Sequence, residues 1–279
     1  MSDLGYGAVE NLIITDVKLM AKTGEVLCDE NIDVLKSYVR ARLVINTATF
    51  LSKELQDAIT GFNTVFLGLS SSMSDEDIAF NLLNSVMSGY LGREFVEKYF
   101  SPEAKADVEN IVKEIIDTYK KRIERLDWMG ESTKAAAIKK LDTMTIKVGY
   151  PDSWDDPYAD IELKSYEDGG SLLGNIFAIT SAQAKHTRTL LDKPVDKSSW
   201  LMPPQMVNAY YNAQNNEIVF PAGILQPPFY DVNAPREQNL GAIGAIIAHE
   251  VTHAFDHNGA QFDEKGNMNN WWTQEDYET

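Results

Sequence analysis

Residues 239–255, NLGAIGAIIAHEVTHAF, form the stretch that decides how this sequence folds and what chemistry it carries. Its apolar residues recur at the spacing that places them on one face of an α-helix. They are Leu240, Ile243, Ile246, Ile247 and Val251. Asparagine is a favoured N-cap residue, so the helix is predicted to begin at Asn239. The stretch is therefore predicted to be an amphipathic helix that packs against a core.

The same helix carries a pattern of polar residues that is typical of a metal site. His249 and His253 are four positions apart, with Glu250 directly after the first of them. Residues i and i+4 share a helix face, so both imidazoles can bind one cation. Glu250 is offset from that line and is free to take a proton from water. Asp256 follows three residues after His253 and can accept the second ring N–H of a ligand histidine.

The spacing alone leaves another interpretation open. Two histidines and a glutamate at these offsets arise by chance in about one chain of this length in a hundred. Surface histidines beside a helix-favouring glutamate would give the same letters. The amphipathic helix around the motif and the position of Asp256 favour the hydrolytic zinc site.

His257 is a third histidine close in sequence, but it cannot complete the site. Eight helical residues separate it from His249, a rise of about 12 Å. Two nitrogens on one zinc ion lie within about 4 Å of each other, so these two residues cannot share a metal. Asn258 and Gly259 form a helix-end signal, which predicts that His257 lies in the last helical turn.

The third protein ligand of a catalytic zinc ion is most often a carboxylate when the other two are histidines. The carboxylates after His253 are Asp256, Asp263, Glu264, Glu275, Asp276 and Glu278. None of them lies in a second helical pattern of the form E-x-x-x-D, so the third ligand is not identifiable in this chain. The longer motif H-E-x-x-H-x-x-G-x-x-H is excluded, because Asp256 stands where it needs glycine and Gly259 where it needs histidine.

Composition limits the remaining possibilities. With 42 acidic and 25 basic residues, the chain has a formal net charge of −17, which argues against nucleic acid as a partner. Cys28 is the only cysteine, so no intrachain disulfide can form. No apolar run is long enough to span a membrane, and the first residues lack the pattern of a signal peptide. We therefore expect no membrane partner and a cytoplasmic location.

The rest of the sequence is mostly helical in pattern. Ser74, Ser101 and Ser132 stand where helix N-caps are expected, and Pro102 suits a first turn. Helices are predicted within residues 33–55, 77–100, 108–129, 132–144 and 171–192. A short β-type run, TIKVG, begins at residue 145, where the pattern changes.

A β-hairpin is predicted before the histidine helix. The β-prone segments VNAYY, residues 207–211, and EIVF, residues 217–220, flank the polar NAQNN. The expected fold class is mainly α with a small β-hairpin or sheet region.

Three stretches read together resemble the neprilysin and endothelin-converting-enzyme family of zinc metallopeptidases, especially its bacterial oligopeptidase O members. They are VNAYYNAQNNEIVFPAGILQPPFYD at 207–231, GAIGAIIAHEVTHAFDHNGAQFDEKGN at 241–267 and WWT at 271–273. Looser similarity extends back into the helical half. The resemblance implies part of a helical lid domain in residues 1–144 and the start of a zincin-like catalytic domain in residues 145–279.

The resemblance also implies a role for individual residues. His249 and His253 would bind Zn²⁺, Glu250 would activate water and Asp256 would support a ligand histidine. Asn208 and Ala209 would hydrogen-bond the main chain of an oligopeptide substrate, which fits an exposed strand edge. The pocket for the residue after the cleaved bond would be lined by Phe229, Ala245 and Ile246. In the family the third zinc ligand lies in an E-x-x-x-D helix further along, so it is expected beyond Thr279.

Two hypotheses about function follow. In the first, the sequence derives from a zinc endopeptidase that cleaves small peptides before hydrophobic residues, and this chain is an incomplete piece with weak or no activity. In the second, the chain is a non-catalytic helical binding or scaffold domain, or a degenerate relative without a functional metal site. A site with two histidines and no third ligand should bind zinc weakly, which keeps the second hypothesis open for the isolated chain.

Overall fold

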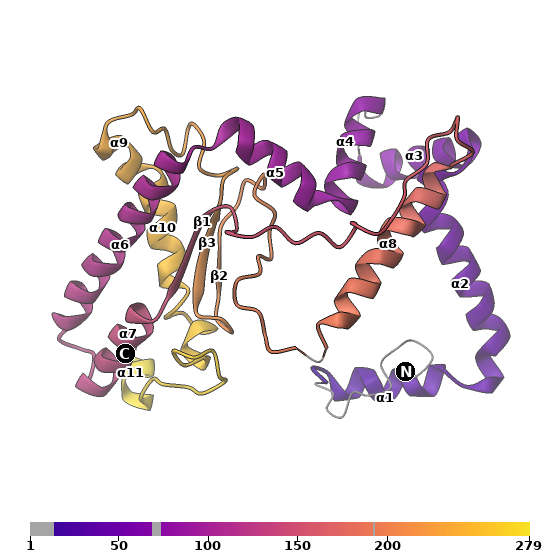
Figure 1. Cartoon of the computed structure of the whole chain (residues 1–279). Helices are drawn as coiled ribbons and strands as arrows, with labels where there is room; N and C mark the ends of the chain where they lie inside the picture. Colours follow the sequence, from indigo (N-terminus) through magenta and orange to yellow (C-terminus); the bar gives the residue numbers. More distant parts are fainter. Residues whose placement is uncertain (1–13, 69–73, 192) are drawn as a thin grey trace. The chain divides into compact units, whose positions relative to one another are not determined.

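The computed structural model describes residues 14–68, 74–191 and 193–279 (Figure 1). The chain divides into two compact units, and each is described by itself. Unit 1 consists of Met1–Val86 and Asp156–Pro194, and unit 2 consists of Met87–Asp155 and Val195–Thr279. The chain therefore leaves unit 2 after Asp155 and returns to it at Val195.

Unit 1 is helical in its described residues. Its α-helices are α1 (Val17–Val26), α2 (Ile32–Thr47), α3 (Lys53–Leu67), α4 (Asp75–Val86) and α8 (Leu172–Thr189). Two 3₁₀ turns, η2 (Asp29–Asn31) and η3 (Ala48–Phe50), connect the first three helices. The predicted cap at Ser74 is present, since its hydroxyl accepts the backbone N–H group of Asp77. Ser171 caps α8 in the same way and accepts the N–H of Gly174.

Unit 2 contains the predicted hairpin and the histidine helix. Its helices are α5 (Ser88–Tyr99), α6 (Pro102–Glu124), α7 (Glu131–Asp142), α9 (Arg236–Gly241), α10 (Ile243–Thr252) and α11 (Gln274–Glu278). Its strands are β1 (Thr145–Gly149), β2 (Tyr210–Asn212) and β3 (Glu217–Pro221), and a 3₁₀ turn, η4, covers Gly259–Gln261.

The three strands form one sheet in the order β1-β3-β2. β3 pairs in parallel with β1 and antiparallel with β2, where Tyr211 faces Ile218. β3 is central and all of its residues are buried, which explains the apolar run from Ile218 to Pro221. The predicted hairpin is confirmed, with a shorter first strand than its sequence pattern indicates.

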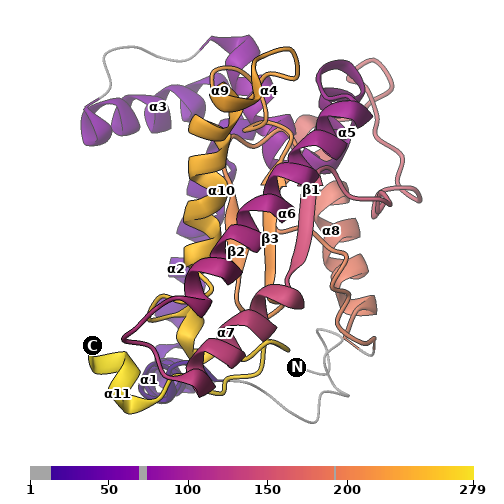
Figure 2. The same ribbon diagram turned by 90° about the vertical axis from the view of Figure 1, so that its left-hand side faces the viewer.

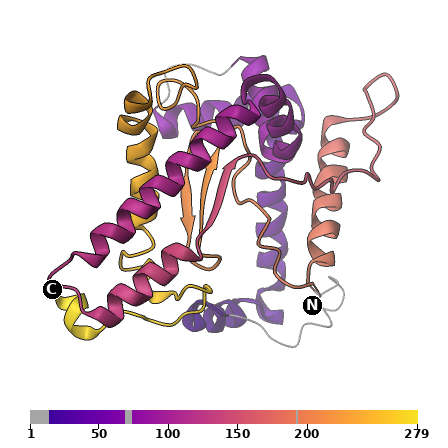
Figure 3. The ribbon, with the colours of Figure 1, turned by 60° about the vertical axis from the view of Figure 1, so that its left-hand side comes forward.

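Helices α6 and α10 pack beside this sheet and form the core of unit 2. Figures 2 and 3 show α6 crossing α10 obliquely, with the sheet beside them. α6 contacts α10 and β1, and α10 also contacts β2. Ile243, Ile247 and Val251 of α10 are completely buried at intervals of four residues. The Tyr119 hydroxyl of α6 donates to the Ala248 carbonyl at 3.0 Å. The apolar stripe and this hydrogen bond fix the rotation of α10.

Several helix ends differ from the sequence predictions. Residues 33–55 and 77–100 do not form single helices, because the chain turns at residues 48–52 and again at Met87, where unit 2 begins. The predicted cap at Ser132 is wrong: α7 begins at Glu131, and the cap position is two residues earlier, at Gly130. The Gly130 N–H donates to Asp276 of α11 at 2.8 Å, so a residue distant in sequence holds the start of α7.

The histidine helix also begins later than predicted. Asn239 does not cap it, since it lies inside α9 and Ala242 separates α9 from α10. The Asn239 side chain instead exchanges two hydrogen bonds with the backbone of Asp231, at 3.1 Å and 2.8 Å. Asparagine favours such local backbone bonds, which here hold the loop before α9.

The fold class, mainly α with a small sheet, is confirmed. The compact units are divided at other places than residue 144, and the assignment of lid and catalytic domains stays a prediction. Among the described residues, no helix combines the length and the apolar character that crossing a membrane requires.

A buried ion pair supports the sheet and gives a first testable prediction. The Lys147 Nζ lies 2.7 Å from the Glu217 carboxylate, and their side chains are 9% and 0% exposed. Lys147→Met should lower the free energy of unfolding of unit 2 by about 3–5 kcal/mol, because Glu217 then stays buried without a counter-charge. The double variant Lys147→Met/Glu217→Gln removes both charges and should recover most of that loss.

Tryptophan fluorescence during urea unfolding measures the free energy of unfolding of unit 2 alone. All five tryptophans lie in that unit, at Trp128, Trp154, Trp200, Trp271 and Trp272. An equal loss of stability in the single and the double variant would contradict the ion-pair explanation.

Candidate metal centre

The two motif histidines face each other at the end of α10. His249 lies within the helix, and His253 is its C-cap residue with helical backbone angles, φ −62° and ψ −18°. Their Nε2 atoms are 3.1 Å apart, and their ring planes are nearly perpendicular, at 85°. The i and i+4 spacing therefore places both imidazoles at one point, as predicted.

This geometry fits a zinc ion. Ligand atoms of His249, Glu250 and His253 all lie within 4.8 Å of one another. Two nitrogens on a tetrahedral zinc ion at about 2.1 Å are about 3.4 Å apart, close to the separation found here. Among residues 14–68, 74–191 and 193–279, these three form the one group of histidine, cysteine and carboxylate side chains that could hold a metal.

Asp256 sets the proton position on His253. Its Oδ2 lies 2.7 Å from His253 Nδ1, so the proton stays on Nδ1 and the Nε2 lone pair faces His249. Its Oδ1 accepts the backbone N–H groups of Asn258 and Gly259, both at 2.9 Å. Burial raises the pKa of Asp256, but the hydrogen bonds from Gly259, His253 and Asn258 outweigh it and hold the pKa below its usual value.

Glu250 lies beside the histidines in a drier environment. Its side chain is buried, with 7% of the residue exposed. Burial raises the pKa of Glu250, while the two histidines and the backbone N–H of Tyr211 act in the opposite direction. A carboxylate with a raised pKa is a stronger proton acceptor, which suits a general base.

A cavity of about 410 Å³ opens at this point and joins the histidines to the edge strand. Its lining includes His249, Glu250, His253, Asp256, Asn208, Ala209, Tyr210, Tyr211, Ala213, Asn258 and Gly259. Asn208 and Ala209 thus lie in the same cavity as the motif, just before β2. β2 has a neighbouring strand on one side only within the described sheet, so an extended peptide could pair with its other side.

The other predicted pocket residues lie outside this cavity lining. Phe229 precedes α9, and its carbonyl accepts the N–H of Ile243 at 3.0 Å, at the start of α10. Ala245 and Ile246 lie on α10, one turn before His249. Their role as a substrate pocket stays a prediction.

His257 is exposed and is not part of the metal group. Its predicted position in the last helical turn is wrong, because α10 ends at Thr252. The chain bends at Asp256, whose carboxylate accepts the N–H groups of the two residues after His257. His186, on α8 in unit 1, is also outside the group.

Three supporting contacts were not predicted from the sequence. They are the Tyr119 bond to Ala248, the Tyr211 N–H bond to Glu250, and a buried lysine, Lys140, below the end of α10. Only Lys140 has a sequence signal. It shares the helical stripe of Thr133, Ala137 and Leu141, all buried, and a charge on a buried stripe indicates a specific partner.

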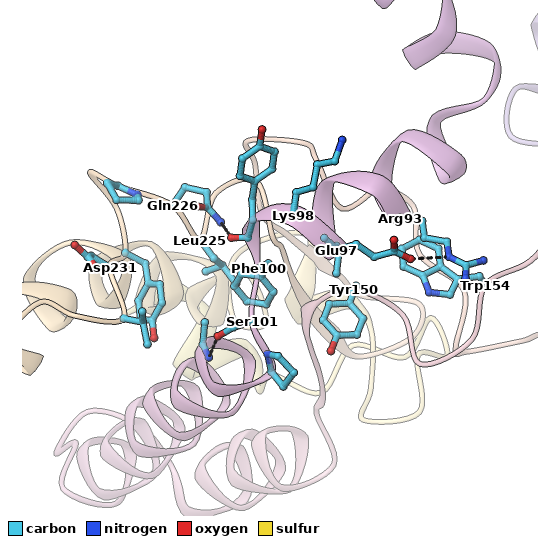
Figure 4. A pocket seen from close by; sticks show the side chains of 17 residues that line it. Arg93, Glu97, Lys98, Phe100, Ser101, Tyr150, Trp154, Leu225, Gln226 and Asp231 are labelled. Carbon is cyan, nitrogen blue, oxygen red and sulfur yellow. Dashed lines mark hydrogen bonds and ion pairs between the residues drawn. The ribbon is translucent and has the colours of Figure 1, made fainter.

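A larger cavity of about 690 Å³ lies between the end of α5 and the loop before α9 (Figure 4). Aromatic rings of Phe100, Tyr150 and Trp154 line it, and two of its charged residues, Arg93 and Glu97, pair with each other at 3.2 Å. It contains none of the metal-group residues. The larger of these two cavities is therefore not the one that contains the candidate metal ligands.

Comparisons with known proteins identify the family of this chain. Residues 2–151 and residues 208–279 match the two sequence models of peptidase family M13. A neutral endopeptidase of Lactobacillus helveticus is 38% identical over 96% of this chain. A putative zinc metalloproteinase of Streptococcus gordonii is 36% identical over 96% of the chain.

Solved structures show the same fold. PEPO from Lactobacillus rhamnosis superimposes with a TM-score of 0.81 at 34% identity, over 92% of this chain and 40% of that one. The Mycobacterium tuberculosis zinc metalloprotease ZMP1 in complex with an inhibitor gives a TM-score of 0.83 at 36% identity, over 91% and 38%. The chain spans 41% of the Lactobacillus helveticus relative and 47% of the Streptococcus gordonii relative. Because one family model matches more than half of the chain and these relatives match 96% of it, the chain belongs to peptidase family M13.

Proposed function

We propose that this chain carries the histidine ligands and the catalytic base of a zinc-dependent endopeptidase. The observation that supports this most directly is the facing pair of His249 and His253 Nε2 atoms, 3.1 Å apart. Asp256 orients the second of these rings. A surface pair of histidines would need neither the buried neighbouring glutamate nor the aspartate that selects the metal-binding tautomer.

The reaction is hydrolysis of a peptide bond. A zinc ion held by His249 and His253 would supply a Lewis acid, which would polarise the carbonyl and make water more acidic. Glu250 takes a proton from the attacking water, which adds its oxygen to the carbonyl carbon. When the carbon–nitrogen bond breaks, Glu250 returns that proton to the leaving amine. The partly desolvated carboxylate lines the same cavity as Asn208 and Ala209, which supports this role.

Substrate binding is proposed at the edge of the sheet. An extended peptide would run along Asn208 and Ala209, with main-chain hydrogen bonds that are independent of its side chains. Phe229, Ala245 and Ile246 would favour a hydrophobic residue after the cleaved bond. Oligopeptides are the proposed substrates and the cytoplasm the proposed location, and we propose no membrane or nucleic-acid partner.

A non-catalytic role for the isolated chain is the second candidate, and one observation favours it. In the described part of the chain, the group that could hold a metal consists of the two histidines and Glu250. If Glu250 serves as the base, a third protein ligand is still required. The isolated chain would then bind zinc weakly and position its base poorly.

We predict that the 279-residue chain alone hydrolyses peptides at least about 100-fold more slowly than a protein of the relatives' full length that contains it. The absence of a third zinc ligand should lower activity by more than the 10–100-fold that is typical when an outer hydrogen-bond partner of a ligand is lost. The measurement is cleavage of a quenched fluorescent oligopeptide with a hydrophobic residue at its centre. The longer protein should lose activity with a chelator and regain it with zinc.

Chelator-sensitive turnover by the short chain at the rate of the longer protein would contradict this prediction. Activity of the longer protein that is insensitive to the chelator would contradict the proposed function itself.

A further inference from the structure

Lys140 is a charged residue in the core of unit 2. It lies in the last turn and a half of α7, and only 1% of its surface is exposed. An ammonium group is strongly hydrated and is rarely buried so completely unless all of its donors are satisfied. Its partners therefore indicate what this position does.

All three N–H donors of the ammonium group have carbonyl partners. The Lys140 Nζ donates to the carbonyls of Ala254 at 3.0 Å, Gly259 at 2.6 Å and Phe262 at 2.7 Å. These acceptors all belong to the segment that follows His253. A lysine has three donors, so this set uses them completely.

The carbonyls that bind Lys140 lie on both sides of Asp256 in the sequence, and Asp256 is the residue that contacts His253. Asp256 lies between Ala254 and Gly259, and Gly259 takes part in both networks. Its carbonyl accepts from Lys140, while its N–H donates to Asp256 Oδ1 at 2.9 Å. Moving the Gly259 peptide would therefore move Asp256, whose other oxygen contacts His253 Nδ1.

Other neighbours of the Lys140 ammonium group also belong to the candidate metal centre or lie close to it. Burial lowers the pKa of Lys140 to about 8, while the negative charges of Asp263 and Asp256 oppose this shift. The Nζ atom also lies 5.7 Å from the ring centre of Tyr211, whose backbone N–H bonds to Glu250, and 5.5 Å from that of Trp271. Position 259 requires glycine for the chain to pass this close to His253, because a Cβ atom there would overlap the His253 carbonyl.

We propose that Lys140 is a positioning residue that holds the segment 254–262 so that Asp256 orients His253 for zinc. This inference rests on the proposed function only for the identity of the metal. It predicts two separate effects of losing the ammonium group: loosening of the Asp256 loop in the metal-free chain, and weaker zinc binding.

The test uses Lys140→Met in the full 279-residue chain. Hydrogen exchange by NMR should be at least about tenfold faster at the Asn258 and Gly259 amides than in the unchanged chain, relative to the core amide of Val112. The dissociation constant for Zn²⁺, measured by calorimetry, should rise about 10–100-fold. The double variant Lys147→Met/Glu217→Gln is the matched control, since it also removes a buried lysine from unit 2 and should change neither value.

The outcomes separate the inference from the proposed function. If the exchange rates and the zinc affinity of Lys140→Met equal those of the unchanged chain, or if the control variant loses zinc affinity to the same extent, the positioning role is wrong. If the unchanged chain binds zinc too weakly to measure, hydrogen exchange in the metal-free chain still decides the inference, and the chelator experiment on the longer protein decides the proposed function separately.

A measurement without any variant covers the case in which Lys140→Met does not fold. Binding effects are reciprocal, so a lysine that favours zinc binding must itself be held more firmly when zinc is bound. Reductive methylation followed by mass spectrometry should show Lys140 labelled several-fold more slowly with saturating Zn²⁺, and Lys147 unchanged. Equal labelling of Lys140 with and without the metal would overturn the inference.

Discussion

Glu250→Gln should nearly abolish peptide hydrolysis and leave the metal in place. In a full-length peptidase that contains this chain, kcat/KM is expected to fall by about 10²–10⁴-fold, the range for loss of a general base. Glutamine has nearly the same size and keeps an oxygen that can accept the Tyr211 N–H. It cannot take a proton from water, so the loss falls on the chemical step rather than on folding or zinc binding.

Zinc content and activity must be measured on the same samples. The variant should contain as much zinc as the unchanged enzyme, by atomic absorption, while its cleavage of a fluorescent oligopeptide is lost. Glu237→Gln is a matched control, because Glu237 is an exposed glutamate on α9 and should retain full activity. Full activity of Glu250→Gln would rule out Glu250 as the base.

The parts of the site that the sequence could predict are those set by local spacing. A helix fixes the relation between His249 and His253, so their convergence follows from position alone. Asp256 is close to His253 in sequence, but it lies past the end of α10, and the turn after the helix brings it to His253 Nδ1. The hairpin before the helix is equally local, since both strands and the turn lie within residues 207–221. These predictions did not require knowledge of any distant partner.

The parts that could not be predicted depend on contacts between distant segments. The Gly130 N–H donates to Asp276, which lies 146 positions away, and Lys140 donates to carbonyls more than 100 positions away. A helical pattern shows that Lys140 faces the core but not which groups it meets there. The ends of α10 were misplaced for a similar reason: Asn239 bonds to the Asp231 loop instead of capping the helix.

The division into two compact units also depends on contacts between distant segments, and the sequence did not predict it. Residues 156–194 read as a helix with an irregular connection before it, and nothing in that pattern shows that they group with residues before Met87. A linear boundary near residue 144 follows the change from helical to mixed patterns. The compact units instead depend on contacts between segments distant in sequence, since residues 156–194 group with residues 1–86.

His253→Ala should remove measurable zinc binding from the 279-residue chain. The variant leaves His249 as a single imidazole beside Glu250, and it also leaves Asp256 without the ring that it orients. Loss of a direct ligand should weaken binding by more than the roughly 10–100-fold expected for Asp256→Asn, which only removes the outer partner. Calorimetric titration with Zn²⁺ should therefore rank the variants in that order, with His249→Ala equal to His253→Ala.

His257→Ala is the control that makes this ranking specific. It removes an exposed imidazole four residues further along, outside the metal group, and should bind zinc like the unchanged chain. A similar loss of affinity in His257→Ala and His253→Ala would mean that zinc binds the surface histidines in general. Because residues 249 and 253 converge through one turn of helix while residue 257 follows the bend at Asp256, only the first two can share a metal, and the order of affinities tests that geometry directly.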